Sequence, residues 1–218
     1  MRVMIINPNT TAAVTAQVVE HLRIYLDANA VLLGSTAKFG VPVIATAQAF
    51  ATGAEAALGS LNDALRDGLA FDRVLLACFG DPGLEAMQSN TCKPVVGLAQ
   101  ACMHSAERTA LPYAVVTAGA AWEPILERRF EQWGASSLFC GIHVLQGTGL
   151  DIFNNPLGVM PAVSKGIDAA RAAGAPRIIL GGAVFAGYKA LMERAGVNTQ
   201  GLLDCIECAA GALCRAKL

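Results

Sequence analysis

A cysteine stands where a buried strand is expected to end. Residues 73–77 form an apolar run rich in branched side chains, and Cys78 follows it directly. Residues 80–83, Gly-Asp-Pro-Gly, then form a turn, as when a parallel strand passes through a loop into a helix. A thiol can act as acid or base near neutral pH, and a helix N-terminus beside it favours the thiolate. Cys78 is therefore either a reactive group or a small core residue.

A second polar turn follows the first apolar run of the chain. Residues 3–6 are apolar, and Asn7, Asn9 and Thr10 come shortly after them. Their amides, hydroxyl and backbone N–H groups can hold a carboxylate or imide oxygen at a strand-to-helix turn. The alternative is ordinary turn chemistry, in which Thr10 or Thr11 caps the following helix.

The other cysteines indicate structural thiols. The chain has seven cysteines, and an odd number in a mid-sized, core-rich chain argues for reduced thiols and against a disulfide framework. Cys205 and Cys208 form a C-x-x-C pair, but their surroundings have the spacing of an amphipathic helix and hold no second ligand pair. Buried helix packing therefore explains them better than metal or redox chemistry.

Composition excludes several classes of partner. Of the 218 residues, 54% are hydrophobic and only 6% are aromatic, which suits small side chains packing helices on a parallel sheet. The net charge of −1 and the absence of a basic cluster argue against nucleic acid. No apolar run approaches the roughly 20 residues of a membrane span, and an early turn at Pro8 argues against a signal peptide. We therefore expect a cytoplasmic protein whose partner is a small molecule.

Strand-like and helix-like segments alternate along the chain. Short apolar runs predict strands at residues 3–6, 31–33, 73–77, 94–97, 113–119, 142–145 and 177–183. Helical spacing predicts helices after residue 11, from 46 or 53 to 69, and at 101–108, 122–133 and 163–173, with further helices to the C-terminus. This alternation predicts an α/β fold of mostly parallel sheets flanked by helices.

The chain contains a short internal sequence repeat. Residues 73–78 and 177–182 superimpose without a gap, which places Gly182 opposite Cys78. Two similar α/β halves would bring both turns to one cleft, and ligand sites favour such interfaces. We expect a first half at 1–97, a second half at 98–199, and a C-terminal helix at 200–218 that packs back on the first half.

Several motifs together resemble the Asp/Glu racemase superfamily, and most closely its hydantoin and allantoin racemase branch. They are residues 6–10, 77–83, 94–97 and 180–183, and the motif around Cys78 is the most specific. The resemblance implies two pseudo-symmetric, flavodoxin-like halves, no cofactor and a homo-oligomer. It also implies action at an acidic α-carbon of a hydantoin-like substrate (a 5-substituted hydantoin or allantoin) or an amino-acid-like one.

The resemblance further implies roles for individual residues. In this family two cysteines flank the α-carbon; one thiolate removes a proton from one face, and the other thiol protonates the opposite face. Cys78 matches the first cysteine, and the second falls on Gly182, which has no side chain. Backbone N–H groups would stabilise the developing enolate-like oxygen near Phe79, Gly80, Gly182 and Ala183. The side chains expected to hold the ring or carboxylate are Asn9 and Thr117, with Asn7 and Thr10 beside them.

Gly182 leaves several interpretations open. The chain is a racemase inactivated at this position by a natural or engineered change, or it uses one thiol, as the arylmalonate decarboxylases do with a cysteine in the second half. A water or a nearby residue such as His104 or His143 is a third possibility, although a histidine on an apolar segment is usually structural. A different class is a small-molecule-binding protein without turnover.

Overall fold

Two parallel four-stranded sheets carry the fold in the computed structural model, which describes residues 1–216. The first sheet has the order β2-β1-β3-β4 and consists of β1 (Arg2–Asn7), β2 (Val31–Thr36), β3 (Arg73–Leu76) and β4 (Val95–Gly97). The second has the order β6-β5-β7-β8 and consists of β5 (Tyr113–Ala118), β6 (Phe139–Leu145), β7 (Arg177–Leu180) and β8 (Leu202–Asp204). Every strand pair is parallel, so the predicted fold class is confirmed.

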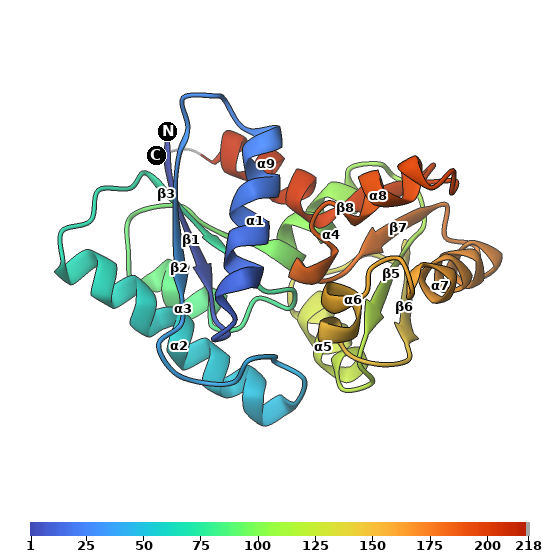
Figure 1. The fold of residues 1–218 in the computed structure, drawn as a ribbon, viewed down its shortest axis with the longest axis horizontal. Coiled ribbons are helices and arrows are strands. Elements are labelled where there is room, and N and C mark those ends of the chain that lie inside the picture. The colour runs from blue at the N-terminus through green and yellow to red at the C-terminus, as the bar shows by residue number, and fades with distance from the viewer. Residues whose placement is uncertain (217–218) are drawn as a thin grey trace.

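Helices cover both sheets (Figure 1). Those in and after the first sheet are α1 (Ala12–Tyr25), α2 (Ala47–Arg66), α3 (Leu84–Ser89) and α4 (Leu98–Glu107). Those in and after the second are α5 (Trp122–Gln132), α6 (Gly149–Asn154), α7 (Met160–Ala172), the short 3-10 helix η1 (Ala183–Phe185), α8 (Tyr188–Arg194) and α9 (Cys205–Arg215). No described helix has the length and apolar character that a membrane crossing requires.

The two sheets repeat one topology. In each, the first strand of the half lies between the second and the third, and the register is equivalent, with Val3 opposite Arg73 and Tyr113 opposite Arg177. Cys78 therefore stands two residues beyond the end of β3, as Gly182 does beyond the end of β7. The carboxyl ends of parallel strands form the ligand crevice of such sheets, so both positions lie at the functional edge.

Helix α9 joins the halves. It follows β8 of the second sheet directly, yet it packs on α1 and α4 and contacts β3 and β4 of the first sheet. Cys205 and Cys208 are buried on this helix, as expected for packing residues. Apolar side chains from both halves form one cluster here, including Cys102, Val115 and Ile179.

Some local expectations differ from the structure. The second sheet continues past residue 199, since it includes β8. The sequence did not predict this strand because three residues are too few to show a strand pattern. Thr11 is the N-cap of α1, but its side chain does not cap the helix; its hydroxyl donates to the carbonyl of Pro42 at 2.8 Å. The Thr11 N–H instead donates to Oδ1 of Asn9 at 2.9 Å.

Candidate active site

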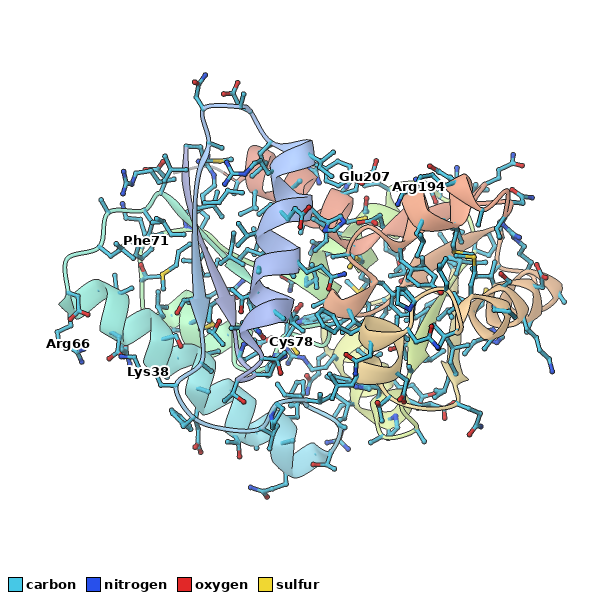
Figure 2. All side chains as sticks on the ribbon, in the orientation of Figure 1. Lys38, Arg66, Phe71, Cys78, Arg194 and Glu207 are labelled. Carbon is cyan, nitrogen blue, oxygen red and sulfur yellow. The ribbon has the colours of Figure 1, made fainter. Side chains whose placement is uncertain are left out.

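A cleft lies between the carboxyl edges of the two sheets, and Cys78 and Gly182 both line it. Figure 2 shows Cys78 in the middle of the molecule, between the two halves. About 80 Å³ of the cleft is open to the centres of water molecules, which is room for several waters or one small ligand.

The lining of the cleft carries almost no charge. Among the described residues that form it, Cys78 is the one side chain with an ionisable group. The rest are apolar residues, glycines and alanines, together with three polar side chains, those of Asn9, Thr117 and Thr148. Because an unpaired charge is costly to bury, the lining favours a neutral ligand. In the described chain, no group of three or more His, Cys, Asp or Glu side chains could hold a metal ion.

Cys78 is buried and only 6% exposed. Burial raises the pKa of its thiol well above the usual range, and the nearby Asp81 carboxylate raises it further. The expectation that a helix N-terminus would favour the thiolate is therefore wrong for the free protein, because α3 begins only at Leu84. The thiol is protonated at neutral pH and donates weakly to the Phe79 carbonyl, with the sulfur 3.8 Å from the oxygen.

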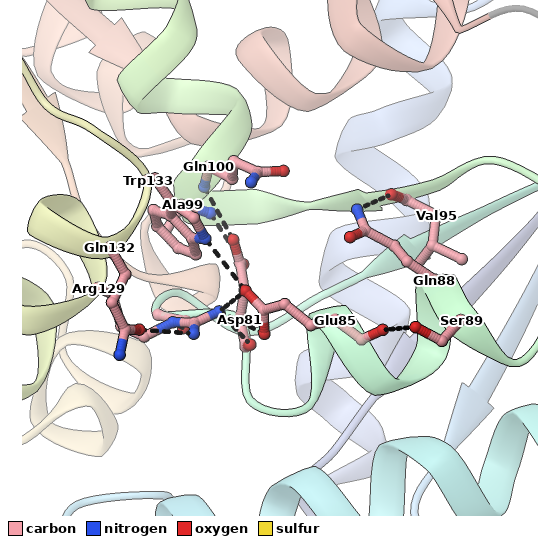
Figure 3. A network of polar contacts seen from close by, with 11 residues as sticks. Asp81, Glu85, Gln88, Ser89, Val95, Ala99, Gln100, Arg129, Gln132 and Trp133 are labelled. Atoms are coloured by element: carbon pink, nitrogen blue, oxygen red, sulfur yellow. Dashed lines mark hydrogen bonds and ion pairs between the residues drawn. The ribbon is translucent and has the colours of Figure 1, made fainter.

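Asp81 shapes the loop that carries Cys78. Its backbone has a positive φ of 55°, which is uncommon outside glycine. Its carboxylate accepts the N–H groups of Ala99 at 3.0 Å and Gln100 at 2.8 Å, so it caps α4 (Figure 3). Burial nevertheless raises the pKa of Asp81 to about 7, against the opposing effect of these N–H groups.

Asn7 and Asn9 have different environments. Asn7 is fully buried, and its Nδ2 contacts Oδ1 of Asn9, the Thr11 carbonyl and Oγ1 of Thr15 at 2.9 to 3.2 Å. It holds the turn and does not line the cleft. Asn9 lines the cleft, and its Oδ1 already accepts from Asn7 and Thr11. The Nδ2 group of Asn9 is therefore the part of its amide that can bind a ligand.

The second half supplies backbone groups. Thr117 is buried, and its hydroxyl donates to the Gly181 carbonyl at 2.7 Å, so towards a ligand it can act only as an acceptor. The Gly182 carbonyl accepts from Phe185 N–H at 2.9 Å and faces the Cys205 thiol at 3.3 Å. Ala183 begins η1, and the first N–H groups of a helix have no partner within it. These N–H groups can bind an oxygen of a ligand.

The structure brings most of the candidate residues together. The members that line the cleft are Asn9, Cys78, Phe79, Thr117, Gly182 and Ala183. Those outside its lining are Asn7, Thr10 and Gly80, as well as the two histidines His104 and His143. Among the lining residues that sequence reasoning missed are Trp122, Thr148 and Ile152. The sequence does contain a signal that places Thr148 at the start of a helix. Thr148 and Asp151 have the spacing of a capping box, and they form one in the structure.

Known proteins share this architecture. A family model described as Asp/Glu/Hydantoin racemase matches residues 3–213. A hydantoin racemase from Paenarthrobacter aurescens is 28% identical over 214 residues, which cover 96% of this chain and 88% of that protein. The crystal structure of allantoin racemase from Pseudomonas fluorescens has a TM-score of 0.88 at 26% identity, covering 99% of this chain and 91% of that one.

A more distant likeness concerns the fold alone. The crystal structure of arylmalonate decarboxylase has a TM-score of 0.61 at 14% identity and covers 100% of this chain and 94% of that one. The family model, by contrast, spans nearly the whole chain, and the relatives in sequence and in structure are named racemases. The chain belongs to the Asp/Glu/hydantoin racemase family of isomerases, in its hydantoin and allantoin racemase branch.

Proposed function

We propose that the protein is a cofactor-independent racemase-type enzyme that acts at the acidic α-carbon of a hydantoin-like substrate, with Cys78 as its acid and base. One observation carries this proposal: Cys78 is the one ionisable side chain among the described residues of an otherwise uncharged cleft. A proton leaving or joining carbon in this cleft therefore has one protein group to exchange with.

The uncharged lining supports a neutral ring over a free amino acid. A free amino acid carries an ammonium and a carboxylate, and no charged side chain of the described cleft lining would pair with either. A 5-substituted hydantoin or allantoin instead offers ring N–H and C=O groups. Asn9 Nδ2 can donate to a ring carbonyl, and the hydroxyl oxygen of Thr117 can accept a ring N–H.

The positions of these groups support the following chemistry. The Cys78 thiolate takes the α-proton, and the electron pair of the broken C–H bond moves into the adjacent carbonyl, forming an enolate. N–H groups near Phe79 and Ala183 stabilise the new negative charge on oxygen. Cys78 then returns a proton to the same face, or a proton reaches the opposite face from water. The raised pKa of Cys78 makes the thiolate scarce at neutral pH, so only a small fraction of the free protein carries the base.

Gly182 is, in this proposal, the position of the missing second thiol. Its place beyond β7 corresponds to that of Cys78 beyond β3, and it lines the same cleft. A one-thiol decarboxylase or isomerase of the same superfamily is the second candidate function, because a thiol that is neutral in the free protein is suited to protonating a carbanion on one face. A binding protein without turnover is the third.

Exchange of the α-proton in heavy water separates these functions. With an enantiopure 5-substituted hydantoin, the proposed enzyme incorporates deuterium and lowers the optical rotation. A one-thiol decarboxylase or isomerase incorporates deuterium with retention or decarboxylates a malonate, and a binding protein does none of these. Cys78→Ala should abolish exchange, whereas Cys92→Ala, at an exposed cysteine, should leave it unchanged. Exchange that persists at the wild-type rate in Cys78→Ala rules out the proposed role of this thiol.

We also propose that the protein is a cytoplasmic homo-oligomer. Support for assembly comes from exposed apolar side chains beside an unpaired sheet edge: Ile24 on α1 is 69% exposed and Val31 on β2 is 41% exposed. Sedimentation velocity of the purified protein tests this; a single species at the mass of one chain would contradict it.

A further inference from the structure

The second half of the molecule holds the Cys78 loop in three places. The ring of Phe79 packs on Gly181 so closely that a Cβ there would lie 2.7 Å from Cε1. The Trp122 ring lies beside Gly80, where a Cβ would lie 2.8 Å from Cζ3. The third contact is polar and comes from Arg129 on α5. The position of the loop relative to the opposite wall of the cleft therefore depends on all three.

The Arg129 side chain is only 13% exposed and has five partners, one of which is Oε1 of Gln132, which accepts from Nη1 at 3.1 Å. Its Nε donates to the Gly80 carbonyl at 3.2 Å, and one terminal nitrogen lies 3.4 Å from the Asp81 carbonyl oxygen. The same nitrogen contacts both carboxylate oxygens of Glu85, at 2.7 and 3.0 Å. The guanidinium carbon lies 4.5 Å from the centre of the Trp133 ring. Figure 3 shows Asp81, Glu85 and Gln132 around the Arg129 guanidinium. Only a planar group with several N–H donors can satisfy them together.

A second hydrogen bond, within the backbone, links the peptide that Arg129 contacts to Cys78. The Gly80–Asp81 peptide accepts from Arg129 at its carbonyl, and its N–H donates to the Cys78 carbonyl at 3.1 Å. The described chain has no cis peptide bond, and in a trans peptide the C=O and N–H point in opposite directions. Because the Cys78 carbonyl is fixed by this bond, the N–H of Phe79 in the same peptide is fixed too, pointing away from Asp81. Such a chain of hydrogen bonds also strengthens each of its members.

We propose that Arg129 is a positioning residue: through the Gly80–Asp81 and Cys78–Phe79 peptides it directs the Phe79 N–H at the site of the developing enolate oxygen and holds Cys78 against the α-carbon. Arg129 is not among the residues that line the cleft. The inference rests on the proposed function, since it assigns Arg129 a part in that same reaction. The ion pair with Glu85 does not explain the residue by itself, because Glu85 is 56% exposed and such pairs contribute little.

The first test separates orientation from binding. Arg129→Ala should lower kcat for α-proton exchange by roughly 10- to 100-fold, while KM changes less than about threefold. The reason is that other groups, Asn9 and Thr117, bind the hydantoin ring of the substrate. Arg129→Lys should recover little of this loss, because an ammonium lacks the planar fork. Methylguanidinium added to Arg129→Ala should restore part of kcat, and the same addition to Cys78→Ala should restore nothing. Arg128→Ala, at the exposed neighbour on the same helix, is the matched control and should behave as wild type.

The second test does not need turnover. The rate at which iodoacetamide alkylates Cys78, followed in its own peptide by mass spectrometry, should rise about fivefold or more in Arg129→Ala, because the loop loosens, and stay constant in Arg128→Ala. If the wild type does not exchange the α-proton of any hydantoin, the proposed function fails. The alkylation rate of Cys78 still tests whether Arg129 fixes the position of the loop. Alkylation equal in the two alanine variants overturns the inference, as does a kcat loss that methylguanidinium leaves unchanged or a loss confined to KM.

Discussion

The carboxylate of Asp81 occupies the space in which a side chain on Gly97 would lie. A Cβ at Gly97 would collide with Oδ2 and Cγ of Asp81. Gly97 is the N-cap of α4 and has no side chain to cap it, so Asp81 reaches across from the preceding loop and caps the helix instead. Two motifs separated in the chain, the one around Cys78 and the one at residues 94–97, are thus one structural unit.

Gly97→Ala should lower the free energy of unfolding by about 1–3 kcal/mol, the usual cost of overpacking a core. The backbone at Gly97, with φ −87° and ψ 143°, suits any residue, so the whole effect comes from contact with Asp81 and Leu84. Urea unfolding measures it. Gly59→Ala is the control, since the added carbon meets only Phe39 at 3.8 Å, and it should be neutral or stabilising. Equal stability of the two variants would show that Asp81 does not hold this position.

Asp81→Asn should change how stability depends on pH. Burial raises the pKa of Asp81 in the native state from 3.8 to about 7, so between these values the native state holds a proton that the unfolded chain has released. Stability therefore falls as pH rises through this window, by up to about 1.4 kcal/mol per pH unit. The variant should lose this slope, apart from a residual share from Asp204, whose pKa burial also raises. Urea unfolding at several pH values in this window measures the effect. If the free energy of unfolding changed with pH in the same way in the wild type and the variant, Asp81 would not be responsible.

The same substitution should shift the pH profile of α-proton exchange. Exchange by a thiolate rises with pH as Cys78 loses its proton, and the charge of Asp81 raises the pKa of that thiol. Asp81→Asn removes the charge, so the rising limb should move to lower pH. Asp67→Asn, at a side chain that is 64% exposed, should leave the profile in place. If the rising part of the pH profile had the same midpoint in both variants, the charge of Asp81 would have no effect on the pKa of the reacting group.

Gly182→Cys should increase racemisation relative to exchange, because it adds a second thiol to the other wall of the cleft. A Cβ at this position lies 3.3 Å from both Val184 and Phe185, and the Gly182 φ of 159° strains any side chain placed there. Gly182→Ala makes the same contacts without a thiol and is the matched control. Polarimetry beside deuterium incorporation gives the ratio, and identical ratios in the two variants would contradict the prediction.

Strand ends and family motifs made much of the site predictable. Cys78, Asn9 and Gly182 each follow a strand whose apolar run is visible in the sequence, and parallel sheets gather such positions at one edge. Trp122 and Ile152 were missed because they lie on α5 and α6 and not at the end of a strand, and no local pattern shows that these helices face the cleft.

The role of polar residues was harder to foresee. Asn7 and Asn9 stand two positions apart with the same side chain, yet one is a buried support and the other faces the cleft. Asp81 read as a turn residue, although its carboxylate serves a helix that begins 17 positions later, at Leu98. Such contacts depend on which strands are neighbours in the sheet, so they emerge only with the three-dimensional fold.

The repeated topology of the two sheets gives the cleft two equivalent corners, and only one of them holds a thiol. A pair of identical acid–base groups related by such a repeat treats the two mirror-image forms of a substrate alike. With a thiol beyond β3 and bare backbone beyond β7, the two faces of a bound α-carbon meet different groups. Proton transfer on the face towards β7 would therefore have to use water, whereas the face towards β3 has the thiol beside it.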